Sequence, residues 1–335
     1  MKMKDVADAA GVSVMTVSRA FREDASISAK TRSKIREAAD RLGYVFDNTA
    51  ASFRTKRTGF VAVIIPSINN ANFAETVRGL SDVLSQNGYQ VLLGYTNYKA
   101  EREEELVEQF LSRRPDAIVL TGGAHTERAQ NLLRNAAIPI VETWDMPTFP
   151  MGHVVGFSNE NAMKALVGHL VTKGAKRIAF IGGDSVEDPR GRSRRLGFLA
   201  AMEHFGLDAS RLIDAGEPPI SMTEGASAME ALLETFPDTD AVACVSDLCA
   251  FGALSTAMRR GITIPGDLML AGFGAYEIAS VAVPSLTTID AFPRAIGEQA
   301  AQIILETNAN SGPVSKTKIE IEPELRLGRS TRRDQ

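Results

Sequence analysis

From residue 59 onward, short continuous apolar runs alternate with longer amphipathic segments, and this alternation restricts the chain to a narrow group of folds. Continuous apolar runs are typical of parallel strands buried on both faces, and amphipathic segments predict the helices that cover them. The strands are expected at Phe60–Ile65, Gln90–Tyr95, Ala117–Thr121, Ile138–Thr143, Arg177–Ile181, Ala241–Val245 and Leu268–Gly272. The expected helices include Phe73–Gln86, Glu101–Arg113, Asn161–Lys173, Arg194–Phe205, Thr223–Thr235 and Leu248–Arg260. An α/β body of about 270 residues favours two lobes.

Parallel sheets bind ligands beyond the carboxyl ends of their strands, so two such lobes predict a ligand in the cleft between them. Catalysis is not indicated, because Glu142 and Asp145 stand at a strand end without a nucleophile or a set of metal ligands nearby. Cys244 and Cys249 lack the Cys-x-x-Cys spacing of a zinc site and make no disulfide framework. We therefore expect a binding protein that is not an enzyme and that holds no metal and no cofactor.

The first 58 residues differ from the rest of the chain in charge. They carry 12 Lys and Arg against 7 Asp and Glu, whereas the remainder carries 25 against 34. A small basic segment on an acidic body indicates that one end of the chain meets a polyanion. The start lacks the apolar run of a signal peptide, and no stretch of about 18 apolar residues exists. A cytoplasmic protein without a membrane span is expected.

Capping signals divide residues 3–44 into three short helices. Gly11 ends the first helix, Ser13 can cap a second one from Val14 to Phe21, and Ser28 can cap a third that stops at Gly43. The apolar side chains that supply a small core are Val6, Ala10, Val12, Val17, Ile35 and Leu42. A helix, a tight turn at glycine and a second capped helix predict a helix-turn-helix, and a plain capped hairpin is the alternative.

The second helix of this motif carries the side chains that are expected to read DNA. Val14, Met15 and Arg19 lie outward, and Arg19 can contact a guanine through two hydrogen bonds. Val14 and Met15 suit a thymine methyl group and offer little hydrogen-bond code, so the operator sequence stays open. The hydroxyls that can bond phosphates and fix the register are those of Ser13, Thr16 and Ser18.

The run Val-Ser-Val-Met-Thr-Val-Ser-Arg at residues 12–19 closely resembles the head of the lactose-repressor (LacI/GalR) family of bacterial regulators. The resemblance continues through residues 31–35 and 42–44 and then covers essentially the whole chain. It implies an all-α helix-turn-helix head in residues 1–44 and a hinge helix or linker in residues 45–58. It also implies a two-lobed, periplasmic-binding-protein-like α/β domain with parallel sheets in residues 59–335, which binds the ligand and dimerises.

The same resemblance adds three DNA contacts, at Thr31, Asn48 and Phe53. In the family, paired hinge helices push a leucine into the minor groove, and Phe53 occupies the matching position. Phenylalanine can also wedge between base steps and bend the duplex. The alternative is that Phe53 packs on the body, and the departure from leucine leaves the geometry of the kink open.

The resemblance further implies a set of effector-binding positions around the cleft. Arg194, three residues before Gly197, matches the arginine with which the family grips its ligands. His125 is either a ligand contact or a surface histidine. The whole expected set is Asn72, Phe73, His125, Trp144, Asp145, Arg194, Ile220, Ser246, Asp247 and Gly274.

Residues 272–275 read Gly-Phe-Gly-Ala, where many family members carry an aspartate that accepts hydrogen bonds from ligand hydroxyls. A pocket that loses this anion and keeps Arg194 favours a negatively charged ligand. Arg190, Arg192 and Arg195 either add to the positive field or form a solvated start of a helix. Several short runs, such as Gly156-Phe157, resemble the gluconate-utilisation repressor branch, so a sugar acid such as gluconate is the expected effector.

These observations predict a homodimeric transcription regulator that binds near-palindromic operator DNA and is controlled by a small sugar-like molecule. We expect a repressor that the effector releases from DNA, although an effector that acts as a corepressor would use the same two domains. A regulator of the same family that answers to a neutral sugar or another metabolite is the nearest alternative. A solute-binding protein for transport would share the body, but it would need an export signal and would have no basic head.

Overall fold

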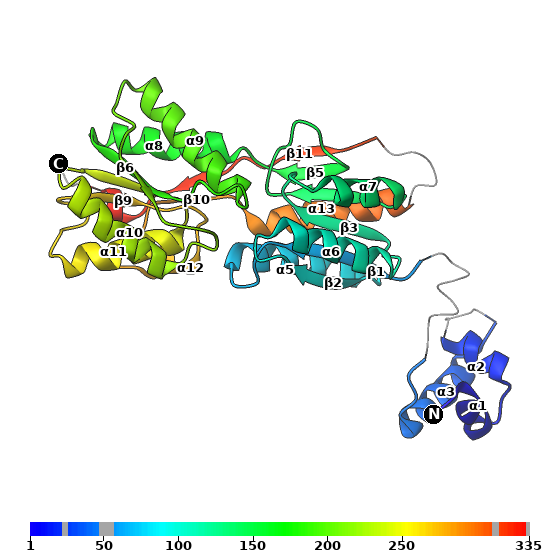
Figure 1. The fold of residues 1–335 in the computed structure, drawn as a ribbon. Coiled ribbons are helices and arrows are strands. Elements are labelled where there is room, and N and C mark those ends of the chain that lie inside the picture. The colour runs from blue at the N-terminus through cyan, green and yellow to red at the C-terminus, as the bar shows by residue number, and fades with distance from the viewer. Residues whose placement is uncertain (22–25, 47–56, 310–314, 333–335) are drawn as a thin grey trace. The chain divides into compact units, whose positions relative to one another are not determined.

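The computed structural model describes residues 1–21, 26–46, 57–309 and 315–332, which fall into two units, Met1–Thr58 and Gly59–Gln335 (Figure 1). The helices of the first unit are α1 (Met3–Ala10), α2 (Val14–Phe21) and α3 (Ala29–Leu42). They pack around a small core of Val6, Ala7, Ala10, Val17, Ala20, Ile35, Ala38 and Ala39. The helix-turn-helix expected from the sequence is therefore present.

The predicted caps of the head helices are confirmed. Gly11 and Gly43 end α1 and α3 with φ of 61° and 63°, a left-handed conformation that glycine adopts without a Cβ clash. Ser13 Oγ accepts a hydrogen bond from the Thr16 amide at 3.1 Å, and Ser28 Oγ accepts one from the Thr31 amide at 3.2 Å. These local bonds define where each short helix begins and ends.

The N-terminal lobe of the body is a six-stranded parallel sheet with the order β11-β5-β4-β3-β1-β2. Val61 and Val63 of β1 belong to the core that includes α5, whereas Ala62 and Ile64 belong to a separate core with α6 and α7. Helices therefore cover both faces, as the continuous apolar runs predicted. The strands are β1 (Phe60–Ile65), β2 (Gln90–Tyr95), β3 (Ala117–Thr121), β4 (Ile140–Thr143), β5 (His153–Gly156) and β11 (Lys318–Glu320). The helices are α5 (Ala71–Gln86), α6 (Ala100–Leu111), α7 (Glu127–Asn135) and α13 (Pro293–Ala309).

The C-terminal lobe contains a four-stranded parallel sheet with the order β7-β6-β8-β9 and an antiparallel pair, β10 with β12. Its strands are β6 (Ile178–Gly182), β7 (Leu212–Asp214), β8 (Ala241–Cys244), β9 (Met269–Ala271), β10 (Thr288–Asp290) and β12 (Glu324–Arg326). Its helices are α8 (Asn159–Thr172), α9 (Pro189–His204), α10 (Met222–Thr235), α11 (Asp247–Arg259), α12 (Glu277–Val281) and the 3-10 turn η1 (Arg329–Thr331). The chain passes between the lobes from β5 to α8, from β10 to α13 and from β11 to β12 (Figure 1). Within the described part of the chain, we find no helix long and apolar enough to cross a membrane.

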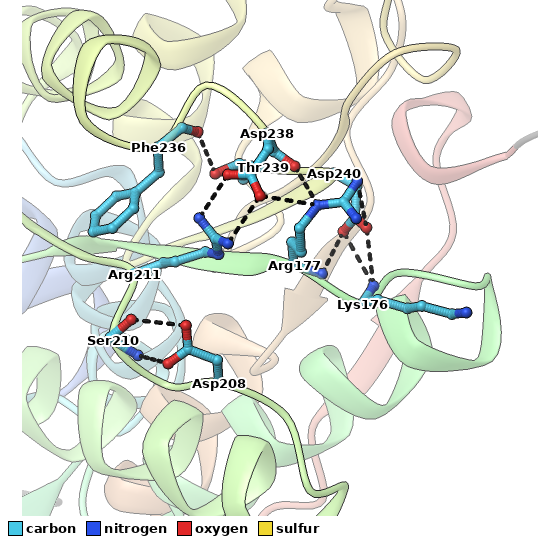
Figure 2. Close-up of polar contacts among 9 residues, drawn as sticks. All are labelled: Lys176, Arg177, Asp208, Ser210, Arg211, Phe236, Asp238, Thr239 and Asp240. Carbon is cyan, nitrogen blue, oxygen red and sulfur yellow. Dashed lines mark hydrogen bonds and ion pairs between the residues drawn. The ribbon is translucent and has the colours of Figure 1, made fainter.

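A charged network holds the amino-terminal edge of the second sheet (Figure 2). Asp240 Oδ1 accepts hydrogen bonds from the amides of Lys176 and Arg177 at 3.1 and 2.9 Å. Arg211 makes two bonds, of 2.9 and 3.1 Å, to the carboxylate of Asp238, which is 55% exposed. Exposed ion pairs contribute little to stability, about 0–1 kcal/mol each. The network links the loops that precede β6, β7 and β8. Ligands of parallel sheets bind at the opposite end of the strands, the carboxyl end.

Helices α5 and α13 approach closely because glycines stand where they touch. A Cβ on Gly79 would lie 2.4 Å from the carbonyl oxygen of Arg294, and one on Gly297 would lie 2.0 Å from that of Thr76. Neither backbone can yield without separating the helices. This close approach positions the start of α13 beside α5, next to the cleft.

Gly297→Ala is expected to destabilise the body by about 1–3 kcal/mol, because the added methyl group has no space against the Thr76 carbonyl. Urea unfolding followed by circular dichroism measures the change. Gly168→Ala is the matched control, since a Cβ at this helical glycine of α8 would meet only ordinary contacts with Phe205, at 3.7 Å. The control is expected to be neutral or to stabilise by up to about 1 kcal/mol. A Gly297 variant as stable as the wild type would contradict the packing argument.

Candidate functional site

The structure places the expected base-reading side chains on the exposed face of α2. Val14 is 43% exposed, Met15 is 62% exposed, and Arg19 is also exposed, whereas Val17 of the same helix is buried. Ser13 is exposed, and its hydroxyl lies 2.9 Å from that of Thr16. The start of α2 therefore presents two neighbouring hydroxyls beside the apolar pair.

Two other expected DNA contacts have a different setting. Ser18 is only 7% exposed because it faces the core of the head, which is a poor position for a phosphate contact. Thr31 lies in the first turn of α3, and its hydroxyl is 2.9 Å from that of Ser28. Asn48 and Phe53, the hinge positions, lie outside the residues that the structure describes.

A cavity of about 170 Å³ opens where the carboxyl ends of the strands of the two lobes meet. The polar loop after β1, Tyr98 after β2 and Trp144 after β4 line it from the N-terminal lobe. Loops after β6, β7, β8 and β9 line it from the C-terminal lobe. The predicted residues that it brings together are Asn72, Phe73, Trp144, Arg194, Ile220, Ser246 and Gly274.

Arg194 is held firmly in this cavity by three neighbours. Its Nε donates to Asn159 Oδ1 and its Nη1 to the Val245 carbonyl, both at 2.9 Å. Its guanidinium lies over the ring of Phe273, 3.8 Å from the centroid, in a cation–π contact. Burial lowers the pKa of Arg194 from its ordinary value, but a guanidinium remains charged in proteins. The side chain is a fixed positive group with donors left for a ligand.

Arg190 is a second cation in the cavity, one turn before Arg194 on α9. It is 5% exposed, lies 5.6 Å from the ring centroid of Phe73, and its Nη1 is 3.5 Å from the Thr121 carbonyl of the other lobe. Of the three arginines that the sequence analysis treated as one cluster, only Arg190 therefore lines the cavity. Arg192 and Arg195 lie near Asp184 on the outside, at 3.3 and 3.8 Å.

The cavity contains a carboxylate from another position, although the aspartate expected in many family members at residues 272–275 is absent. Asp188 lines it, and one of its oxygens lies 3.5 Å from Arg190 Nη2. A Cβ on residue 191 would lie 2.4 Å from Asp188 Oδ2, so Gly191 gives this carboxylate its space. Asp188 follows β6 and precedes Pro189 of α9, so it lies at the carboxyl end of a parallel strand, where ligands bind. This position was a signal available in the sequence.

Polar side chains join the lobes across the cleft. Tyr276 Oη donates to Asn70 Oδ1 at 2.8 Å, and Asn72 Nδ2 donates to the Gly274 carbonyl at 2.9 Å. Burial raises the pKa of Tyr98 and that of Tyr276, so both phenols stay neutral hydrogen-bonding groups. Amides and phenols of this kind suit the hydroxyls of a polyol. The sequence prediction missed Asn70, Tyr98 and Tyr276.

Asp247 and Asp145, both expected in the site, do not line the cavity. Asp247 is fully buried behind its wall, where Oδ2 accepts from the Tyr276 amide at 2.8 Å, and burial raises its pKa to about 6. A Cβ on Gly272 would lie 2.1 Å from Asp247 Oδ1, so this carboxylate supports the loop that carries Tyr276. Asp145 Oδ1 accepts from the Met146 amide at 2.8 Å and belongs to a local turn.

His125 does not line the cavity, and its side chain is buried, so the surface alternative for this residue was wrong. Its side chain is 1% exposed, with Nδ1 2.6 Å from Glu103 Oε1 and Nε2 3.5 Å from Glu142 Oε1. The carboxylates raise the pKa of His125 to about 9 against the opposing effect of burial. An imidazolium between two carboxylates ties the loop after β3 to α6 and β4, and Gly122 of that loop lies under Arg190.

Comparisons with known proteins agree with this geometry. Residues 2–47 match the family described as bacterial regulatory proteins, lacI family, and residues 167–331 match the periplasmic binding protein-like domain. The HTH-type transcriptional regulator GntR of Pseudomonas aeruginosa is 34% identical over 303 residues, 90% of this chain and 88% of that protein.

Two solved structures are similar over most of their length. A LacI-family transcriptional regulator from Silicibacter pomeroyi has a TM-score of 0.91 and 34% identity, over 99% of this chain and all of that one. The transcription regulator GntR from Chromobacterium violaceum has a TM-score of 0.76 and 35% identity, over 81% of this chain and 99% of that one. The resemblance seen in the sequence, including the GntR-like branch, is confirmed, and the chain belongs to the lacI family of DNA-binding bacterial transcription regulators.

Proposed function

We propose that this regulator is a homodimeric repressor whose operator affinity is controlled by a sugar acid with one carboxylate, such as gluconate, bound between the lobes. The observation that carries the proposal is the charge of the cavity. Among the described residues that line it, Arg190 and Arg194 are the cations and Asp188 is the anion. The lining side chains therefore carry one surplus positive charge, which favours a ligand that supplies one negative charge. Asp247 lies behind the wall, and its carboxylate offsets part of the charge of Arg194 without lining the cavity.

The polar set of the cavity supports a polyhydroxylated ligand. Arg194 and Arg190 both project from the start of α9, whereas Asn70, Asn72 and Tyr98 come from the N-terminal lobe. A sugar acid would direct its carboxylate to the α9 side and its hydroxyls to the amides and phenols. The similarity to GntR regulators and the short runs of the gluconate-utilisation branch point the same way.

DNA binding would follow from the exposed face of α2 on two paired heads. Two copies related by a two-fold axis would read the halves of a near-palindromic operator through Val14, Met15 and Arg19. A ligand that changes the angle between the lobes would change how the heads are presented. The coupling is reciprocal and typically about 1–3 kcal/mol, so the operator would weaken gluconate binding as much as gluconate weakens operator binding.

Gluconate is expected to raise the melting temperature of the protein by several degrees, and glucose is not. At a concentration 100 times its Kd, a ligand of the folded state stabilises it by about 2.7 kcal/mol. Differential scanning fluorimetry with matched gluconate and glucose series checks this, and fluorescence anisotropy with operator DNA checks release. An equal or stronger effect of glucose would replace the sugar acid by a neutral sugar as the effector.

A further inference from the structure

Asn159 is buried at the point where the chain leaves β5 for α8, and its side-chain amide bonds groups on both sides of the cleft. Oδ1 accepts a hydrogen bond from Arg194 Nε at 2.9 Å, and Nδ2 donates one to the carbonyl oxygen of Trp144 at 3.0 Å. The residue is 1% exposed. One amide therefore joins the cavity arginine of α9 to the end of β4 in the N-terminal lobe.

Trp144 has a backbone conformation that needs such support. Its φ is 71°, in the left-handed region that a bulky side chain occupies only when its surroundings hold it there. The Trp144 amide donates to the Val155 carbonyl at 3.1 Å, and the indole Nε1 donates to Thr76 Oγ1 at 3.0 Å. The bond from Asn159 completes the set by fixing the carbonyl of the same residue.

Thr76 continues the connection into the N-terminal lobe. Its hydroxyl lies 2.9 Å from the Asn72 carbonyl and 3.0 Å from the carbonyl of Pro293, the first residue of α13. Pro293 is where the chain re-enters this lobe after β10. A buried chain of hydrogen bonds thus leads from Arg194 through Asn159, Trp144 and Thr76, and it touches two of the places where the chain passes between the lobes.

We propose that Asn159 is a positioning residue with two roles. It orients the guanidinium of Arg194 in the cavity, and it couples effector binding at Arg194 to Trp144 and to the segments where the chain passes between the lobes. The proposal rests on the proposed function, because the effector carboxylate is what would engage Arg194. The side-chain amide of Asn159 accepts a hydrogen bond from one partner and donates one to the other. Because both bonds lie in one rigid plane, a shift of either partner affects the other. Apolar residues of the same size could fill the space but could not make the two bonds.

Trp144 is the single tryptophan of the chain, so its fluorescence reports on this connection directly. In ligand-free protein, Asn159→Leu is expected to raise acrylamide quenching of Trp144 at least about twofold, because the carbonyl loses its donor. Asn159→Asp keeps an acceptor for Arg194 but has no donor for Trp144, so it is expected to raise quenching similarly. Asn161→Leu, at an exposed position of the same helix, is the matched control and is expected to leave quenching unchanged.

The second measurement is gluconate affinity by isothermal titration calorimetry. Asn159→Leu is expected to weaken it about tenfold or more, since a hydrogen bond to a charged group is lost, while Asn161→Leu matches the wild type. If neither Asn159 variant, each shown to be folded by circular dichroism, differs from Asn161→Leu in quenching, the proposal is overturned. A wild-type protein that ignores gluconate would refute the sugar-acid effector, and the quenching of the ligand-free variants would still test whether Asn159 supports Trp144.

Discussion

Arg194→Ala is expected to abolish the response to gluconate and to leave operator binding without effector intact. The guanidinium is the most firmly held cation of the cavity, with bonds to Asn159 and the Val245 carbonyl and a contact with Phe273. Removing one partner of a buried charge pair costs about 2–5 kcal/mol of binding, which is roughly 30-fold to more than 1000-fold in Kd. Calorimetry with gluconate and anisotropy with operator DNA measure the two properties separately.

Arg192→Ala is the matched control for this experiment. Arg192 lies two residues earlier on the same helix, but its side chain is 51% exposed and lies near Asp184 outside the cavity. Its loss is expected to change gluconate affinity less than twofold, because an exposed pair contributes little. Arg194→Lys keeps the charge without the planar fork and is expected to fall between the two. A normal gluconate response in Arg194→Ala would remove the carboxylate-binding role from this residue.

Local signals account for what the sequence predicted well. Gly11 and Ser28 act within one helix turn of their partners, so the limits of the head helices could be predicted from short segments. The long strands of the body were also predictable, because each is a continuous apolar run. Strands of three or four residues were predicted only where they lie within a longer apolar run, as Ala241–Cys244 and Met269–Ala271 do. The short strands that the sequence prediction missed are His153–Gly156, Leu212–Asp214, Thr288–Asp290, Lys318–Glu320 and Glu324–Arg326.

The cavity was predicted in part, for a reason that also explains the errors. Arg194 and Trp144 match family positions at the ligand edge of the sheets, so the resemblance identified them. The direction of a side chain at such an edge depends on partners far away in the chain. His125, for example, makes its hydrogen bond to Glu103, 22 residues earlier, and does not line the cleft. Asp247 likewise accepts a hydrogen bond from the Tyr276 amide, 29 residues later. The carboxylate that lines the cavity is that of Asp188.

His125→Leu is expected to destabilise the body by about 3–5 kcal/mol, because two carboxylates lose the cation between them. The side chain of Glu142 is 1% exposed and that of Glu103 is 12% exposed, so water compensates little. The triple variant His125→Leu, Glu103→Gln, Glu142→Gln removes the charges as well and is expected to recover much of the loss. His204→Leu, at an exposed position, is the control and is expected to be nearly neutral.

The same cluster predicts how stability depends on pH. The folded pKa of His125 is about 9, above the ordinary value of 6.5, so the folded state binds the proton more tightly than the unfolded state. Its stabilising contribution, up to about 3 kcal/mol, is therefore complete below pH 6.5 and is lost as the pH rises through 9. Urea unfolding of the wild type and of His125→Leu at pH 6.5, 7.5 and 9.5 should show a difference that shrinks with pH. A difference that stays constant over this range would mean that the buried histidine is neutral and that its contribution is packing alone.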